Sequence, residues 1–321
     1  MQLTPRLTLM LSVPPLLWAG NAVVGRLAIA SISPLWLNAS RWAIALLLLL
    51  PLGWRVFAGT QRWAELRARW PHLMLLGLTG VGAYNALQYM ALRTSTPLNV
   101  TLIAASSPVW AMAIGAVFYG VRPHRAQVLG AVLSLAGVAV VLARGQASAL
   151  LQVHLVPGDL LMMAAVVSWC VYSWLLARPP ASMRGDKRPQ WHWSEFLCLQ
   201  IAVGLAWASA SAGVGEWLQP SPGAVHWTTW LVAALAYVSI FPSLVAYRLW
   251  GLAVTEAGPA LATFFGNLTP LFAALLSAAL LGEWPQPFHG LAFLLIAAGI
   301  VVSSRPAHRS SDPGGSPGSA T

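Results

Sequence analysis

Charged residues are scarce in this chain. Asp, Glu, Lys and Arg make up 8% of its 321 residues, whereas about a quarter of an ordinary soluble domain is charged. Apolar residues reach 58%, and the mean hydropathy is +0.68. Apolar runs of about twenty residues recur along the length, as crossing a hydrocarbon core of roughly 30 Å requires. This composition excludes a soluble domain and predicts an all-α polytopic membrane protein embedded in a lipid bilayer.

Patterns that carry metal or catalytic chemistry are also missing. The chain has two cysteines, and its seven histidines stand singly, with no second histidine three or four positions away. It has no HExxH motif, no close pair of acids and no Gly-rich phosphate loop. We therefore expect neither an enzyme, a cofactor nor a metal site, and an ATP-driven pump is excluded. The net charge of +10 is spread over short clusters, so no nucleic-acid partner is expected.

Ten apolar segments can be marked, and most junctions between them carry Pro, Gly or a charged residue. The beginning of the chain resembles a signal peptide, but Pro14 and Pro15 and the continuing apolar run favour a retained first helix. Residues 306–321 are rich in Pro, Gly and Ser and are expected to form a disordered cytoplasmic tail. The expected segments are 7–29, 34–54, 72–92, 97–119, 125–143, 157–177, 194–213, 227–250, 257–281 and 288–304.

Lys and Arg are distributed unevenly over the junctions between segments. If the N-terminus is cytoplasmic, fourteen of the eighteen basic residues lie inside and three lie outside, while Arg41 lies within a segment. Cytoplasmic junctions are enriched in Lys and Arg in membrane proteins. The distribution therefore predicts that both termini are cytoplasmic, which an even number of crossings allows.

The chain contains an internal repeat. A shift of 162 residues aligns the two halves without a gap over about forty positions, and an offset that matches several helix-breaking residues favours duplicated structure over chance. We expect one five-helix repeat over 1–145 and a second over 155–305. The matched pairs are Pro97 with Pro259, Thr101 with Thr263, Pro108 with Pro270, Gly120 with Gly282, Pro123 with Pro285 and Gly137 with Gly299.

Five helices in each repeat would place the second copy upside down in the membrane. The basic turn GVRPHR (120–125) would then face the cytoplasm, and its uncharged counterpart GEWPQP (282–287) would face outside. Inverted repeats are typical of transporters that expose a central site alternately to the two sides of the membrane. Asp159, Glu256 and Glu283 all lie near segment ends, so any proton coupling would use such a carboxylate or the substrate itself, and facilitated exchange stays open.

These stretches resemble the EamA-type members of the drug/metabolite transporter superfamily. The resemblance implies ten helices in two five-helix repeats, and it carries no information about the substrate. One departure is that Glu283 keeps an acidic residue usual after the ninth helix, whereas Val121 stands where relatives usually have one after the fourth. The matching stretches are WAGNAVVGRLA, LNASRWAIALLLLLPL, LQYMALRTSTPLNVTLIAASSPVWAMAIGAVFYG, AVVSWCVYSWLLAR, YRLWGLAVTEAGPALATFFGNLTPLFAALLSAALLGEWP and HGLAFLLIAAGIVV.

Polar side chains within the apolar segments are the candidate lining of a substrate cavity, because burying them in lipid is costly. Tyr84, Asn85, Gln88 and Tyr89 share one helix face, which can hydrogen-bond and stack on a solute, or bond to neighbouring helices. Polar residues beside a proline can instead satisfy the carbonyls that the proline frees. The candidate set is Trp18, Asn21, Arg41, Tyr84, Asn85, Gln88, Tyr89, Ser107, Trp169, Tyr172, Tyr247 and Asn267.

Arg41 has two alternative roles. It lies about 10 Å into the second segment at 1.5 Å per residue, so its side chain either extends to the outer interface or points inward and attracts a carboxylate. The expected function is export of small metabolites, amino acids or related compounds, across a bacterial inner membrane by alternating access. Efflux of drug-like amphipathic compounds is the alternative, and a non-transporting membrane protein and a homodimeric assembly are left open.

Overall fold

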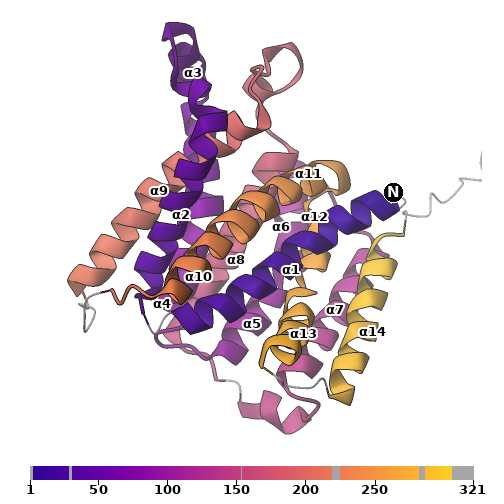
Figure 1. Ribbon diagram of the computed structural model, residues 1–321. Helices are drawn as coiled ribbons and strands as arrows, with labels where there is room; N and C mark the ends of the chain where they lie inside the picture. The colour runs from indigo at the N-terminus through magenta and orange to yellow at the C-terminus, as the bar shows by residue number, and fades with distance from the viewer. Residues whose placement is uncertain (1–2, 29–30, 153, 219–224, 282–285, 306–321) are drawn as a thin grey trace, which may run out of the picture.

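The computed structural model describes residues 3–28, 31–152, 154–218, 225–281 and 286–305, and within these ranges every regular element is helical (Figure 1). Glu283, most of the GEWPQP turn and the tail 306–321 lie outside the described residues. The first half of the chain forms α1 (Pro5–Ala28), α2 (Pro34–Gly53), α3 (Thr60–Leu76), α4 (Tyr84–Ala91), α5 (Pro97–Ala105), α6 (Ser107–Tyr119) and α7 (Arg125–Leu142). The second half forms α8 (Pro157–Ala177), α9 (Trp193–Leu218), α10 (Thr229–Ser239), α11 (Ala246–Ala257), α12 (Pro259–Gly266), α13 (Thr269–Leu281) and α14 (Pro287–Ser303).

Membrane-spanning length is reached repeatedly along the described chain. Seven stretches are long and apolar enough to cross a bilayer, and the pair α5–α6, bent by 42°, would bring the number to eight. The rod that begins with α3 is not among them, because residues 60–70 carry four charged side chains and form a helical extension that the apolar pattern does not indicate. The protein is thus an all-helical, multi-pass membrane protein, and ten crossings stay a prediction.

Helix ends follow the local chemistry of the sequence. Ser33 and Thr96 accept hydrogen bonds from backbone N–H groups of the first turns of α2 and α5, and a proline follows each of them. Gly120 ends α6 with φ of 66°, in the left-handed region that glycine adopts without strain. Such caps place the helix boundaries close to the junctions expected from the sequence.

The two halves are interrupted at matching places. A π-helical turn, η2 (Gly77–Ala83), joins α3 to α4, and a second, η6 (Ile240–Val245), joins α10 to α11. The shift of 162 residues maps 77–83 onto 239–245. It also maps the break between α5 and α6 onto the break between α12 and α13. The internal similarity of the sequence therefore extends to local backbone geometry.

Two pairs of helices lie side by side and antiparallel. Gly130 of α7 lies against Gly299 of α14, where an added Cβ would come 2.7 Å from the Gly299 carbonyl oxygen, and Gly137 lies in the same way against Ala292. The contact thus moves backward along α14 as it moves forward along α7. The shift of 162 residues converts one contact into the other, as a two-fold relation between these helices requires.

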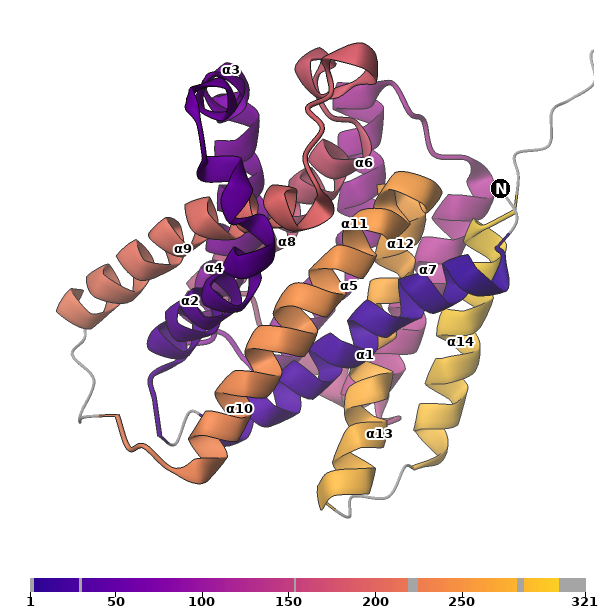
Figure 2. The same cartoon turned by 45° about the horizontal axis from the view of Figure 1, so that its top comes forward.

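The pair α2 and α9 shows the same antiparallel sense. Leu35 contacts Gly215, whereas Gly53 contacts Ser194 and Cys198. Figure 1 shows α2 with α9 at one side of the bundle and α7 with α14 at the other. Between them α1 and α11 pack against each other through the centre (Figure 2). Elements from both halves therefore meet in the middle of the molecule.

Candidate functional site

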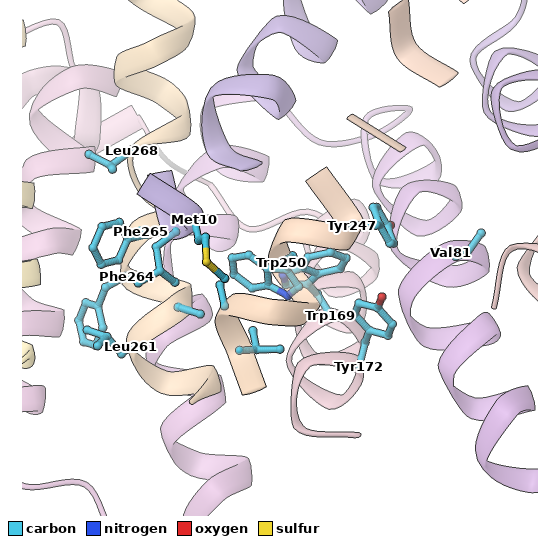
Figure 3. Close-up of a cluster of buried hydrophobic side chains, with 14 of the residues drawn as sticks. Met10, Val81, Trp169, Tyr172, Tyr247, Trp250, Leu261, Phe264, Phe265 and Leu268 are labelled. Carbon is cyan, nitrogen blue, oxygen red and sulfur yellow. The ribbon is translucent and has the colours of Figure 1, made fainter. Parts of the chain in front are cut away.

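Seven aromatic side chains gather at this centre, and we call them the aromatic cluster. Trp169 of α8 is its hub, with ring centroids 5.2 to 5.6 Å from those of five neighbours. Figure 3 shows Trp169, Tyr172, Tyr247 and Trp250 together in the buried core. The cluster comprises Trp18 (α1), Trp42 (α2), Tyr84 (α4), Trp169 and Tyr172 (α8), and Tyr247 and Trp250 (α11).

The polar atoms of the cluster link the two halves. The Tyr247 hydroxyl donates to the Gly80 carbonyl at 2.6 Å, and the Trp18 indole N–H donates to the Pro242 carbonyl at 3.2 Å. Gly80 and Pro242 are 162 residues apart, so the two acceptors occupy equivalent places in η2 and η6. π-Helical turns occur frequently at functional sites, and here each one presents a carbonyl to a donor from the opposite half.

The remaining bonds within the cluster hold the rings in place. The Tyr172 hydroxyl donates to Gln200 Oε1 at 3.0 Å, and the Trp250 indole N–H donates to Ser173 Oγ at 3.1 Å. Trp42 Nε1, in contrast, is buried and has no hydrogen-bond partner in the structure. The cluster is thus an apolar chamber wall whose polar atoms are almost all engaged.

Arg41 lies beside the aromatic cluster and points inward, with 3% of its surface exposed. Its Nε donates to Ser243 Oγ at 3.1 Å, its Nη1 contacts Asn21 Oδ1 at 3.5 Å, and its guanidinium lies 4.7 Å from the ring centroid of Trp42. The Tyr89 hydroxyl also interacts with this guanidinium. The outward orientation toward the interface is therefore not the one observed.

No carboxylate neutralises Arg41 within the described residues. The ion pairs found there join Arg62 to Glu65 and to Glu195, both at the other end of the helix bundle. A buried charge without a counter-ion is costly, and neutral hydrogen-bond partners offset only part of that cost. The positive charge of Arg41 is thus available to an anion that enters the site.

Two further buried polar side chains near Arg41 have no partner at all. Both amide atoms of Asn38 and the hydroxyl of Ser239 are fully buried and make no hydrogen bond. Leaving a buried polar group unsatisfied costs about 1–3 kcal/mol. Asn38 and Ser239 are polar residues in apolar helices, but they are absent from the predicted set because the lack of a partner depends on packing that the sequence does not reveal.

The predicted face of α4 reaches two parts of the site. Tyr84 packs against Trp169 at 5.5 Å, and Asn85 is buried beside it in the same helix turn. Tyr89 touches Arg41 and also lines a pocket of about 200 Å³ between the start of α2, the end of α4 and the end of α9. Gln88 is partly buried on the same face. Arg41 therefore lies one side chain behind this pocket.

Ser107 and Asn267 occupy a different place, at the breaks between α5 and α6 and between α12 and α13. Ser107 Oγ donates to the Ala104 carbonyl at 2.5 Å, and its counterpart Thr269 makes the equivalent bond to Gly266. Asn267 Nδ2 donates to the Ala105 carbonyl and to Ser134 Oγ. These side chains satisfy backbone and side-chain acceptors at the junction of the halves, away from Arg41.

A second, wider pocket of about 680 Å³ lies at the opposite end, between α3 and residues 182–190. Its walls are mainly charged and polar, and Arg69 fastens them by donating to the carbonyls of Ser182 and Lys187. Its open, solvated shape and its distance from the aromatic cluster separate it from the central site.

Similar proteins place the chain in a family. It matches the EamA-like transporter family twice, over residues 7–143 and 156–305. A crystal structure with 23% sequence identity superposes with a TM-score of 0.71, over 93% of this chain and 97% of that one, and so supports the same fold.

Curated relatives match over most of their length. An uncharacterized transporter of Archaeoglobus fulgidus is 28% identical over 94% of this chain and 98% of its own. A probable terminal-alkyne amino-acid exporter of Streptantibioticus cattleyicolor is 28% identical over 73% of both chains. The aromatic amino acid exporter YddG of Ancylobacter novellus is 27% identical over 76% of this chain and 79% of its own. This chain is therefore a member of the EamA-like transporter family and a multi-pass membrane protein.

Proposed function

We propose that the protein is a secondary transporter that exports small metabolites, amino acids or related compounds, across the bacterial inner membrane. Membership of a transporter family and the amino-acid exporters among its relatives support this proposal. The observation that carries it is the central site, where aromatic rings from both halves surround a buried Arg41 that has no counter-ion. A scaffold or a receptor has no need for such a costly arrangement at its centre.

Alternating access of two inverted five-helix halves is the mechanism that we infer. The matched π-helical turns, the matched breaks and the antiparallel α7 and α14 support it. Ten crossings would follow if the rod α3–η2–α4 spans the membrane through its apolar part and α14 spans it as well. Both termini would then lie in the cytoplasm, as the distribution of Lys and Arg favours.

In this mechanism the two halves rock about the aromatic cluster. The bonds from Tyr247 to Gly80 and from Trp18 to Pro242 cross between the halves and would break and re-form as they move. The pocket in front of Tyr89 would be the remnant of one of the two access routes. Efflux of cationic drug-like compounds is less well supported, because the charge of Arg41 repels a cation.

The test is a comparison of metabolites inside and outside bacteria that overproduce the protein, followed by exchange measured in proteoliposomes with any solute that changes. The variant Trp169→Ala removes the hub of the cluster, and Trp217→Ala, at an 80% exposed tryptophan of α9, is the matched control. We expect the control to export normally and Trp169→Ala to lose export while still inserting in the membrane. Equal export by the two variants, or no solute that responds to the protein, would refute the proposal.

A further inference from the structure

We propose that Arg41, Asn38 and Ser239 form a carboxylate-binding subsite, and that the aromatic cluster beside them receives an apolar or aromatic group on the same molecule. This inference rests on the proposed transport function for its meaning, but it concerns binding alone. It assigns the substrate class as small carboxylates with a hydrophobic side group, whether or not they carry an amino group.

The register of two helices places the unpartnered groups at one level. Leu37 of α2 packs with Leu231 and Leu235 of α10, and Arg41 bonds to Ser243 farther along the same rod. α2 and α10–η6 therefore run side by side in the same direction. One helical turn back along each element from Arg41 and Ser243 lie Asn38 and Ser239, both fully buried and both without a hydrogen bond.

The chemistry of these groups fits a carboxylate. The guanidinium carries a permanent positive charge and several donors in a planar fork, the geometry that matches two carboxylate oxygens. The Asn38 amide N–H₂ and the Ser239 hydroxyl can each donate one more bond. A ligand carboxylate would thus satisfy the buried charge and the unpartnered donors together, which no side chain among the described residues does.

The same surroundings offer little to an ammonium group. The Asp and Glu side chains that the structure describes lie at helix ends or in connections, and none of them contacts the subsite. Aromatic rings, in contrast, adjoin it directly, because Trp42 lies under Arg41 and packs at 5.0 Å against Tyr247. The carboxylate is therefore expected to decide recognition, and the amino group is expected to add little.

Access is available through the pocket of about 200 Å³ at the outer ends of α2, α4 and α9. Tyr89 lines this pocket on one side and touches Arg41 on the other. Arg93 at its rim adds a second positive charge. A carboxylate at this end thus meets one exposed arginine first and the buried one behind it.

Three probes separate the contributions: L-phenylalanine, 3-phenylpropionate, which lacks the amino group, and 2-phenylethylamine, which lacks the carboxylate. Binding to the full-length protein in nanodiscs is measured by titration calorimetry, with no gradient applied. We expect the two carboxylates to bind with affinities within about tenfold of each other and the amine not to bind. Arg41→Gln should weaken carboxylate binding by about a hundredfold, given about 1.5–3 kcal/mol for a hydrogen bond to a charged group. Arg122→Gln, at an exposed turn, should leave it unchanged.

The variants Asn38→Ala and Ser239→Ala separate a binding role from a structural one. Each removes a buried group that has no partner, so each should unfold at the same temperature as the parent or a higher one while it binds carboxylates about tenfold more weakly. A destabilised variant with unchanged affinity would overturn the inference. So would binding of the amine equal to that of the carboxylates, binding by Arg41→Gln equal to that of Arg122→Gln, or no binding of either carboxylate. Carboxylates that bind but are not exchanged in proteoliposomes would instead refute the proposed transport and support the subsite.

Discussion

The contact between α7 and α14 leads to a quantitative prediction for Gly299→Ala. A Cβ at residue 299 would lie 2.7 Å from the carbonyl oxygen of Gly130 and 3.0 Å from the backbone nitrogen of Ser134. Both neighbours are backbone atoms, so no side-chain rotation relieves the overlap, and an ordinary contact of 3.4 Å requires the helices to separate by about 0.7 Å. Forcing an extra methyl group into a well-packed contact costs about 1–3 kcal/mol.

Helix propensity opposes this cost and has to be removed from the comparison. Alanine is more favourable than glycine by about 1 kcal/mol in a helix interior. Gly290→Ala in the same helix is the matched control, because a Cβ there meets nothing within 4 Å. Both variants gain the propensity term, so we expect Gly299→Ala to be less stable than Gly290→Ala by about 1–3 kcal/mol.

The assay is unfolding in mixed micelles by titration with sodium dodecyl sulfate, followed by tryptophan fluorescence. Gly130→Ala should show a similar loss, because its Cβ would lie 2.7 Å from the Gly299 carbonyl. The double variant should lose less than the sum of the two, since one separation of the helices accommodates both methyl groups. If Gly299→Ala is as stable as Gly290→Ala, α7 and α14 do not pack as closely as described.

Two further substitutions test single polar contacts. Asp159 is buried at the start of α8 and accepts hydrogen bonds from Ser95, Asn99 and a backbone N–H, so Asp159→Asn should lower the free energy of unfolding by about 1–3 kcal/mol because a donor replaces an acceptor. Asp186→Asn in an exposed connection should have no effect in the same titration. Tyr247→Phe removes the bond between the halves and should change the rate of exchange in proteoliposomes, whereas Tyr237→Phe, which loses only a 3.4 Å contact, should not. Unchanged exchange by Tyr247→Phe would show that this bond does not influence the rocking motion.

Much of the fold could be predicted because it depends on patterns local in sequence. Lipid excludes unpaired backbone groups, so long apolar runs have to be helical, and prolines and glycines mark where those helices stop. The first turns of α3 could not be predicted in this way, because residues 60–70 are polar and are held by contacts with residues 182–190. The π-helical geometry of η2 and η6 is likewise absent from the sequence pattern, since GLTGVGA and IFPSLV share no evident motif.

The site was predictable in its residue types and not in its grouping. Trp18, Trp169, Tyr172 and Tyr247 come from three helices far apart in the chain, and only packing brings their rings together. Ser107 has two interpretations from sequence, and its hydroxyl bonds to a backbone carbonyl in the structure. The unpartnered state of Asn38 is a property of what surrounds it, so no single-sequence argument could rank it beside Arg41.

The π-helical turns have a consequence for how such a molecule can move. A π-helix closes its hydrogen bonds over five residues instead of four, so η2 and η6 each store surplus backbone inside an otherwise regular rod. Releasing one residue of that surplus rotates the rest of the rod by about 100°. Tyr84 and Tyr247 stand directly beyond the two turns, where such a rotation swings an aromatic ring out of the centre. Each half thus holds a reserve of winding, and winding surrendered on one side can be taken up on the other while every connecting loop keeps its length.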